Sequence, residues 1–526
     1  MPLNCKQAAR AALKRASFWL ALLAMATLAG CTQVPIRPAA ATWALPPAAS
    51  GPLASIAEDL RTRHGESVSG FHLLRVNLDA LRWRLALVDT ARQSVDLQYY
   101  VWFGDKVGQL LMARVLAAAE RGVRVRLLVD DLSTLLHDMG HVELRDALLR
   151  QLDRHPRIEI RVFNAWRQRD LAGRALETGF GFDRLNRRMH NKQLLVDNRA
   201  VIIGGRNIGD EYFGLNPEFN FHDLDVLAVG PAARQASEVF DRYWNSAAVS
   251  PLAAVADNDA RPELSPAHRS AMEALAADPR ARQILGGLRD WQPEFDGLAT
   301  RLLPGRGQVH ADRSTTDADA GHLMPATVHR LLRAATREVL ITNAYVIPDQ
   351  TLFDELRGLT RRGVRVRLLT NSLASHDVPA VNSHYERWRR PLIEAGVELH
   401  ELRADAQVKS DVVESAPVRG RFVGLHTKAM VVDGRYAFVG SMNLDPRSEQ
   451  INTEMGIVVD SEALARELAA QMAVDMGPAN SWRVELDGAS ALRWTSDAGT
   501  LDRQPARNAW QRVENLFFKL FPPRLY

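Results

Sequence analysis

The chain carries one pattern of polar and glycine residues twice. The first copy consists of His190, Lys192, Asp197, Gly204 and Asn207, and the second of His426, Lys428, Asp433, Gly440 and Asn443. Every residue recurs at the same offset, 426 − 190 = 236 positions. At typical residue frequencies, such a match arises by chance in roughly one chain of this length in ten thousand. The body of the protein is therefore predicted to contain two similar domains.

A second repeat supports this division. Arg121–Leu128 and Arg362–Leu369 have nearly the same sequence, at an offset of 363 − 122 = 241 positions. Each follows a helix-like stretch that is flanked by strand-like runs. The expected strands cover 95–101, 158–163, 339–346 and 397–402, and the expected helices cover 110–121 and 352–361. This alternation is typical of βαβ units, so we predict an α/β fold with largely parallel or mixed sheets.

The spacing within each motif predicts its local structure. We expect strands over 192–196 and 428–432, in which alternation puts the His and Lys side chains on one face. The residue pairs after these strands, Asp197-Asn198 and Asp433-Gly434, are typical of turns into second strands. Gly204 and Gly440 follow the second strands, where a missing side chain would let a phosphate group approach the backbone.

The N-terminus has the pattern of an export signal. Basic residues precede Phe18–Ala29, an apolar run of 12 residues, which is too short to span a bilayer as a helix. The run ends in Leu28-Ala29-Gly30-Cys31, which resembles a bacterial lipoprotein cleavage box. We therefore expect acylation of Cys31 and lipid anchoring on the periplasmic side of the bacterial cell envelope, at the inner or the outer membrane. An ordinary secretory signal with a chance cysteine is the alternative.

These patterns divide the chain into five segments. We expect a signal peptide at 1–30, a lipoprotein anchor and tether at 31–64, a first domain at 65–250, a linker at 251–320 and a second domain at 321–526. The two cysteines, Cys5 and Cys31, both precede the domains, which excludes a disulfide framework or a cysteine-based zinc site within them. The net charge of +4 suits anionic partners without distinguishing lipid head groups from nucleic acid.

The repeated His-x-Lys-x4-Asp pattern resembles the phospholipase D superfamily, and the resemblance spans nearly the whole body. It implies two similar α/β/α domains with mixed sheets, which are related by a pseudo-twofold axis and share one active site. In such a site one neutral imidazole attacks phosphorus to form a phosphohistidine, while the other exchanges protons with the leaving and incoming hydroxyl groups. The resemblance implies no metal and no cofactor.

The resemblance also implies roles for single residues. His190 would be the nucleophile and His426 the general acid and base, an order that the sequence does not fix. The residues expected to hold the phosphoryl oxygens are Lys192, Lys428, Asn207, Asn443 and Ser441. The first copy has Gly205 where the second has Ser441, so a hydroxyl contact to phosphate is expected on one side only.

Four carboxylates accompany these residues. Asp223 and Glu454 fit the family's places for side chains that orient the histidines and raise their basicity. Asp197 and Asp433 complete the motif, and we expect them to be structural more than chemical.

Two further segments narrow the substrate. Gln98–Trp102 and Asn371–Val381, the latter followed by Tyr385 and Arg389, are similar to bacterial cardiolipin synthases of the C type. The implied reaction transfers a phosphatidyl group to phosphatidylglycerol from a second phosphatidylglycerol or from phosphatidylethanolamine. Phospholipids and a membrane are thus the expected partners and nucleic acid is not, while the need for an accessory protein stays open.

Three alternatives remain at the level of sequence. A phospholipase D hydrolase would use water as the acceptor and release phosphatidic acid. A nuclease or another phosphodiesterase would apply the same motif to a different substrate. A non-catalytic, lipid-anchored binding protein of the envelope would keep the fold without the chemistry, although two complete motifs argue against it.

Overall fold

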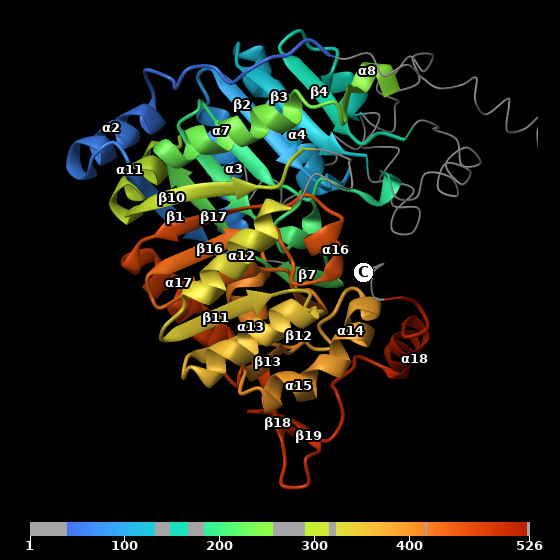
Figure 1. Cartoon of the computed structure of the whole chain (residues 1–526). Coiled ribbons are helices and arrows are strands. Elements are labelled where there is room, and N and C mark those ends of the chain that lie inside the picture. Colours follow the sequence, from blue (N-terminus) through green and yellow to red (C-terminus); the bar gives the residue numbers. More distant parts are fainter. Residues whose placement is uncertain are drawn as a thin grey trace, which may run out of the picture.

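The computed structural model describes residues 39–131, 148–166, 184–255, 290–314, 322–415 and 418–522. The expected signal peptide and Cys31 lie outside the described residues, as does most of the expected linker. The described part forms an upper and a lower half in Figure 1, each built from its own strands and helices. No helix within these ranges is long and apolar enough to cross a membrane.

One continuous sheet runs through both halves (Figure 1). In the first half the strands follow the order β9 (Val249–Pro251), β4 (Ile158–Phe163), β3 (Arg124–Asp130), β2 (Ser94–Tyr99), β5 (Gln193–Val196), β6 (Ala200–Gly204), β8 (Asp225–Val229) and β1 (Ser69–Leu74). The second half continues with β10 (Leu303–Ala311), β17 (Met455–Asp460), β16 (Tyr436–Gly440), β15 (Lys428–Val432), β11 (Glu338–Asn343), β12 (Arg365–Asn371), β13 (Glu398–Leu402) and β18 (Ser481–Leu486). The hairpin of β19 (Leu492–Ser496) and β20 (Gly499–Leu501) extends that edge.

The second half repeats the strand order of the first in reverse. The two halves meet where β1 and β10 pair antiparallel, with Gly70 opposite Pro304. Strands β2, β3 and β4 are parallel to one another, as are β11, β12 and β13, while the other pairs of the continuous sheet are antiparallel. The structure thus confirms two similar α/β domains with mixed sheets, related by a pseudo-twofold axis between β1 and β10.

Helices cover both faces of the sheet. On one face, α3 (Asn77–Thr90) and α4 (Lys106–Glu120) pack on the first half, and α12 (Leu323–Ala334) and α13 (Gln350–Arg361) on the second. On the other face, α7 (Pro231–Trp244) and α17 (Glu462–Asp475) share one apolar core that draws residues from both halves. Leu194 faces the α3 and α4 side and Leu195 the shared core, as the alternation of a strand requires.

Two expected connecting segments contain regular structure. The expected tether includes α2 (Pro52–His64), and the expected linker includes α11 (Gln292–Arg301) and the nine residues of β10. The sequence does not predict a strand at β10, because its glycines lower the propensity for a strand. A Cβ atom on Gly305 would lie 2.7 Å from Cβ of Ser461, and one on Gly307 would lie 2.8 Å from the ring of Phe71. The glycines therefore permit the close packing at which the halves join.

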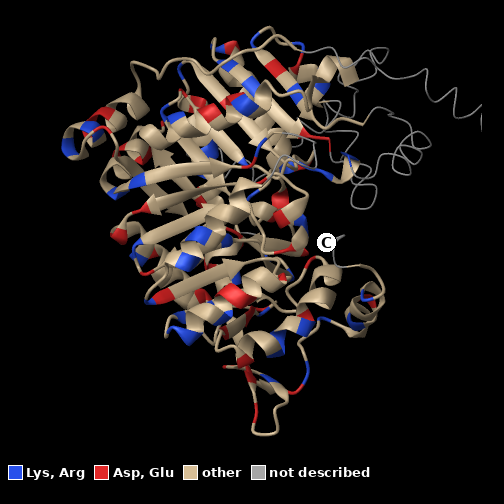
Figure 2. Ribbon diagram, in the orientation of Figure 1, with Lys and Arg blue, Asp and Glu red and all other residues tan. Residues whose placement is uncertain are grey.

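Shorter elements complete the described part. They are α8 (Leu252–Val255), α14 (Pro379–Tyr385), α15 (Arg389–Glu394), α16 (Pro446–Gln450), α18 (Ala509–Phe518), the single turns at Asp210–Tyr212, Glu386–Trp388 and Lys409–Val413, and the pair β7 (Phe219–His222) and β14 (Phe422–Leu425). Figure 2 shows Lys and Arg interspersed with Asp and Glu over both halves.

Candidate active site

Each motif histidine is held by the backbone of the opposite half. The backbone N–H of His190 donates to the carbonyl of Thr453 over 2.8 Å, and that of His426 donates to the carbonyl of His222 over 2.8 Å. The second contact continues the parallel pairing of β7 with β14, which comes from the opposite domain. These crossed pairings bring the two histidines, 236 residues apart in sequence (426 − 190), to one pocket.

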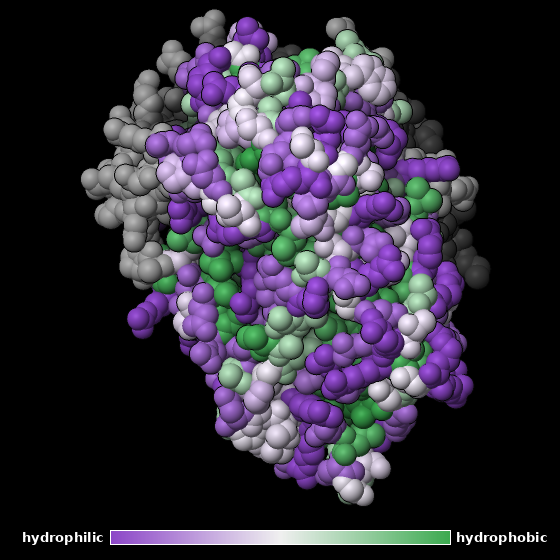
Figure 3. Space-filling view, turned by 90° about the vertical axis from the view of Figure 1, so that its left-hand side faces the viewer, coloured by the Kyte–Doolittle hydropathy of each residue, from purple (hydrophilic) through white to green (hydrophobic). Residues whose placement is uncertain are grey.

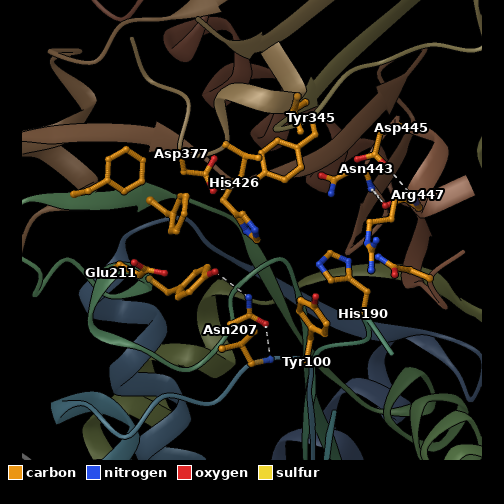
Figure 4. A pocket seen from close by; sticks show the side chains of 18 of the residues that line it. Tyr100, His190, Asn207, Glu211, Tyr345, Asp377, His426, Asn443, Asp445 and Arg447 are labelled. Carbon is orange, nitrogen blue, oxygen red and sulfur yellow. Dashed lines mark hydrogen bonds between the residues drawn. The ribbon is translucent and has the colours of Figure 1, made fainter. Parts of the chain in front are cut away.

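The two candidate orienting carboxylates also act across the interface. Nδ1 of His190 lies 2.8 Å from Oε2 of Glu454, and Nδ1 of His426 lies 2.6 Å from Oδ2 of Asp223. An ionised carboxylate only accepts hydrogen bonds, so in its ionised form each carboxylate fixes the proton of its histidine on Nδ1 and leaves Nε2 for chemistry. In Figure 4 both imidazole rings project into the same space. Each histidine therefore depends on a carboxylate from the other half.

Ser441 lies beside Glu454 in the structure. Its hydroxyl donates to Glu454 and accepts the N–H of Met455 over 3.1 Å, and Ser441 does not line the pocket. It thus supports the partner of His190. In the first half a Cβ atom on Gly205 would lie 2.2 Å from Oδ1 of Asp223, so that carboxylate occupies the corresponding space.

Gly204 and Gly440 have a different function from the expected phosphate approach. A Cβ atom on Gly204 would lie 2.1 Å from Oδ1 of Asp225, and one on Gly440 would lie 2.6 Å from the carbonyl of Met455. Both glycines therefore make room for the neighbouring strand of the sheet. Neither lines the pocket.

The motif lysines lie buried behind the histidines. Nζ of Lys192 donates to the carbonyl of His190 over 2.6 Å, and Nζ of Lys428 donates to that of His426 over 2.5 Å. Each ammonium also lies over a tyrosine ring, at 5.0 Å from Tyr100 in the first half and 5.6 Å from Tyr345 in the second. Since an ammonium has three donors, one bond to a carbonyl leaves capacity for an anionic ligand.

The motif asparagines line the pocket. Oδ1 of Asn207 accepts the N–H of Val101 over 3.2 Å, and its Nδ2 donates to the hydroxyl of Tyr212 over 2.9 Å. Among the described residues, the buried Oδ1 of Asn443 has no hydrogen-bond partner. Buried polar atoms are normally satisfied, so the wall at Asn443 is prepared for a polar ligand or water.

The motif aspartates lie away from the pocket. The carboxylate of Asp197 accepts the backbone N–H groups of Arg92, Gln93 and Ser94. The carboxylate of Asp433 accepts those of residues 336–338 in the same way. Each aspartate thereby ties the turn after its motif strand to the start of a neighbouring strand, β2 or β11.

The pocket itself has a volume of about 560 Å³ and contains residues that the sequence analysis did not select. Beside the histidines it is lined by Tyr100, Tyr345, Tyr212, Glu211, Asp377, Arg447, Asp445, Asn452, Arg507, Phe219, Phe221, Val378 and Val381. Tyr100 and Tyr345 follow the ends of β2 and β11. Because they occupy equivalent positions in the repeat, the sequence could have identified both as pocket residues. Figure 4 shows Arg447 on the side of His190 and Asp377 and Glu211 on the side of His426.

Burial and mutual charge shift the ionisation of the site. Burial, with the nearby lysines, lowers the pKa of His190 well below its usual value and lowers the pKa of His426. Burial also lowers the pKa of Lys428 to about 8 and raises the pKa of Glu454 to about 8. Burial alone would raise the pKa of Asp223 as well, but His426 and nearby cations hold it below its usual range. The two histidine–carboxylate pairs are therefore electrostatically different.

Comparisons with known proteins agree with this arrangement. The family described as "Cardiolipin synthase, PLD-like domain" matches residues 85–244 and 328–476, one segment in each half. Cardiolipin synthase C of Escherichia coli (strain K12) is 37% identical over 458 residues, covering 84% of this chain and 93% of that protein. The major cardiolipin synthase ClsA of Bacillus subtilis (strain 168) is 24% identical over 405 residues, covering 76% of this chain and 67% of that protein.

A solved structure supports the fold. The crystal structure of phosphatidylserine synthase from Haemophilus influenzae Rd KW20 aligns with a TM-score of 0.54 at 14% identity, covering 80% of this chain and 90% of that one. At this identity the likeness concerns the fold alone. Together, the family match in both halves and the 37% identity over most of the chain identify it as an enzyme of the phospholipase D superfamily, of the phosphatidyltransferase and phosphodiesterase class, that belongs to the cardiolipin synthase family.

Proposed function

We propose that the pocket transfers a phosphatidyl group in two steps through a phosphohistidine. The observation that carries this proposal is the meeting of two His-x-Lys motifs at one pocket, each histidine bonded to a carboxylate of the other half. In the first step Nε2 of His190 attacks phosphorus and the bond from phosphorus to the donor's alcohol oxygen breaks. His426 gives its Nε2 proton to that oxygen, and the alcohol leaves.

The second step reverses the proton transfer. His426 removes a proton from the acceptor hydroxyl, whose oxygen attacks phosphorus. The bond from phosphorus to Nε2 of His190 then breaks, which releases the product and restores the neutral imidazole. Lys192, Lys428, Asn207 and Asn443 hold the phosphoryl oxygens during both steps, where negative charge accumulates.

The difference between the histidines supports this order of roles. The pKa of His190 is lowered well below its usual value by burial and the lysines, which favours the neutral, nucleophilic form. Asp223 beside His426 keeps its negative charge, because its pKa lies below the usual range despite burial. A fixed anion at Nδ1 stabilises the protonated imidazole, which is the form that a general acid requires.

We further propose that both substrates are phospholipids and that the product is cardiolipin. The acceptor is phosphatidylglycerol, and the donor is phosphatidylglycerol or phosphatidylethanolamine. The curated relatives named as cardiolipin synthases support this choice. Four apolar side chains on the wall beside His426 suit the glyceryl and acyl portions of a lipid: Phe219, Phe221, Val378 and Val381. The chain would act at the periplasmic side of the envelope, anchored through Cys31.

Hydrolysis by the same two histidines is the second candidate, because water has the size and the acidity to replace the acceptor hydroxyl. The volume of the pocket favours transfer over hydrolysis. At about 560 Å³, it exceeds the space that one phosphoryl group and one water molecule need. A nuclease is disfavoured, because two relatives that match most of the chain are named as cardiolipin synthases.

Lipid mass spectrometry in a host without its own cardiolipin synthases tests the proposal. The chains compared are wild type, His426→Ala and the control His64→Ala, whose side chain is exposed at the end of α2. We expect cardiolipin with wild type and with the control, and none with His426→Ala. Phosphatidic acid without cardiolipin would replace transfer by hydrolysis. If none of the three chains changed the lipids, the proposal that this chain carries out the transfer by itself would be wrong.

A further inference from the structure

The C-terminal helix α18 carries an exposed apolar face. Trp510, Val513, Leu516, Phe517 and Leu520 are 66%, 52%, 64%, 53% and 80% exposed. Their spacing of three and four residues puts them on one side of the helix and its final turn. Six of the ten large apolar side chains that are exposed among the described residues lie within 510–521. Most of the segment 517–521 is therefore exposed.

Polar contacts hold the opposite side of α18 against the body. Nε2 of the buried Gln511 donates to the carbonyl of Leu373, and the buried Asn515 accepts from Asn382 over 2.7 Å and donates to Glu386 over 3.0 Å. These bonds fix the rotation of the helix. A surface helix normally turns its apolar side inward, so this one is inverted, and a contiguous apolar patch of this kind marks an interaction surface.

The apolar face of α18 lies next to the pocket. The helix packs on α14, which contributes Val381 to the pocket wall, and the two lie side by side at the right of Figure 1. Arg507, just before α18, also lines the pocket and packs on the rings of Phe219 and Phe422 at 5.8 and 5.2 Å. One short segment therefore joins the pocket to the exposed face.

We propose that α18 inserts its apolar face into the surface of a lipid bilayer and holds the pocket at the membrane. A tryptophan, aliphatic side chains and phenylalanine on one side, with exposed Arg503 and Arg512 nearby, match the chemistry of a helix that lies in an anionic membrane interface. The choice of a bilayer over a protein partner rests on the proposed phospholipid substrates. Figure 3 shows the face on the opposite side from α18, where hydrophobic residues are interspersed among predominantly hydrophilic ones.

A single labelled cysteine in the full chain tests the insertion. The chain has two cysteines, so Cys5→Ser and Cys31→Ser give a background in which Leu516→Cys carries the only thiol. Its control, Ser55→Cys, lies on the exposed side of α2 at the opposite edge of Figure 1. With phosphatidylglycerol vesicles that contain brominated lipid, we expect a polarity-sensitive dye at 516 to shift to shorter wavelength and be quenched, and the dye at 55 to remain unchanged.

Every result at position 516 decides the matter. A dye that stays in water with vesicles present would refute insertion. A short-wavelength signal without vesicles would also refute it, because the face would then be covered by a second copy or by another part of the chain. The dye reports contact and not turnover, so an inactive protein that inserts would overturn the proposed reaction and leave the docking intact.

A kinetic comparison provides the second test. The double variant Trp510→Ser, Leu520→Ser removes exposed side chains only, so folding is not expected to change. We expect transfer between lipids in vesicles to fall at least tenfold, and transfer between lipids dispersed in detergent to change less than twofold. Equal losses in both assays would show that α18 supports the pocket itself and would overturn the docking role.

Discussion

Replacing the two motif aspartates should affect stability and not chemistry, and to different degrees in the two halves. Asp197 is buried, and its carboxylate accepts three backbone N–H groups, of which that of Ser94 belongs to a buried residue. Asp433 is only partly buried, and its partners Thr336 and Arg337 are exposed. Water can therefore replace the second carboxylate but not the first.

The magnitudes follow from these contacts. Both aspartates have φ of 56°, a left-handed conformation that costs an ordinary side chain about 1–2 kcal/mol. Losing hydrogen bonds to a charged group costs a further ~1.5–3 kcal/mol when the donors are left buried. We expect Asp197→Ala to lower the free energy of unfolding by about 4 kcal/mol and Asp433→Ala by about 2 kcal/mol. Asp197→Asn keeps an acceptor and tolerates the conformation, so its cost should be about 1 kcal/mol.

Urea unfolding of the purified chain, followed by far-ultraviolet circular dichroism, gives the order of stability. Transferase rate per folded molecule is the second measurement, and it should stay within about threefold of wild type for Asp197→Asn, because the side chain does not line the pocket. Lys192→Met is the contrasting variant, with normal unfolding and a rate at least ~10³-fold lower. Equal costs for the two alanine variants, or a large rate loss in a stable Asp197→Asn, would refute this reasoning.

Three further predictions concern ionisation at the histidine pairs. The pH–rate profile of kcat/KM should be bell-shaped: it rises as the His190–Glu454 pair loses a proton, and it falls as His426 and then Lys428 lose theirs. Because burial raises the pKa of Glu454 to about 8 and lowers the pKa of His426, the maximum should lie below pH 8. Glu454 in the folded protein binds a proton more tightly than in the unfolded chain, so its contribution to stability is full below pH 4.5 and is lost as pH rises toward 8. In a plot of the free energy of unfolding against pH, Glu454→Gln should flatten this part of the curve. An unchanged slope in the variant would contradict the raised pKa of Glu454. Ser441→Ala removes the hydroxyl that donates to Glu454 and should move the rising limb of the pH–rate profile to higher pH, whereas the control Ser496→Ala, at the distant end of β19, should leave it in place.

The sequence predicts structure well wherever a signal is local. The expected motif strands, 192–196 and 428–432, correspond to β5 and β15, and the turns after them have the left-handed residues that their sequences favour. The sequence predicts the parallel strands β2, β3 and β4, because apolar runs alternate there with helix-like stretches. Each of these features depends on residues within about one element of one another.

Features that depend on contacts between the halves were not predictable in the same way. Asp223 and Glu454 could be selected as orienting carboxylates, but their crossed attachment to His426 and His190 depends on backbone pairings between distant segments. Strand β10 was missed because packing, and not propensity, requires its glycines. Arg447 reaches the pocket from α16, outside both motifs, and no residue spacing indicated it. Asp377 lies within Asn371–Val381, a segment selected for its resemblance and not for a role in the pocket.

The crossed carboxylates give the two histidines of one pocket different surroundings in a nearly symmetric fold. A glycine at 205 gives Asp223 room beside His426, and a serine at 441 bonds to the longer Glu454 beside His190. Each small residue is matched to the carboxylate that it contacts. Because each carboxylate serves the histidine of the opposite half, a change at position 205 or 441 alters the chemistry of the other domain's motif. Two identical single-motif chains could not carry this difference, because both carboxylates would then be the same, whereas two repeats joined through β1 and β10 can.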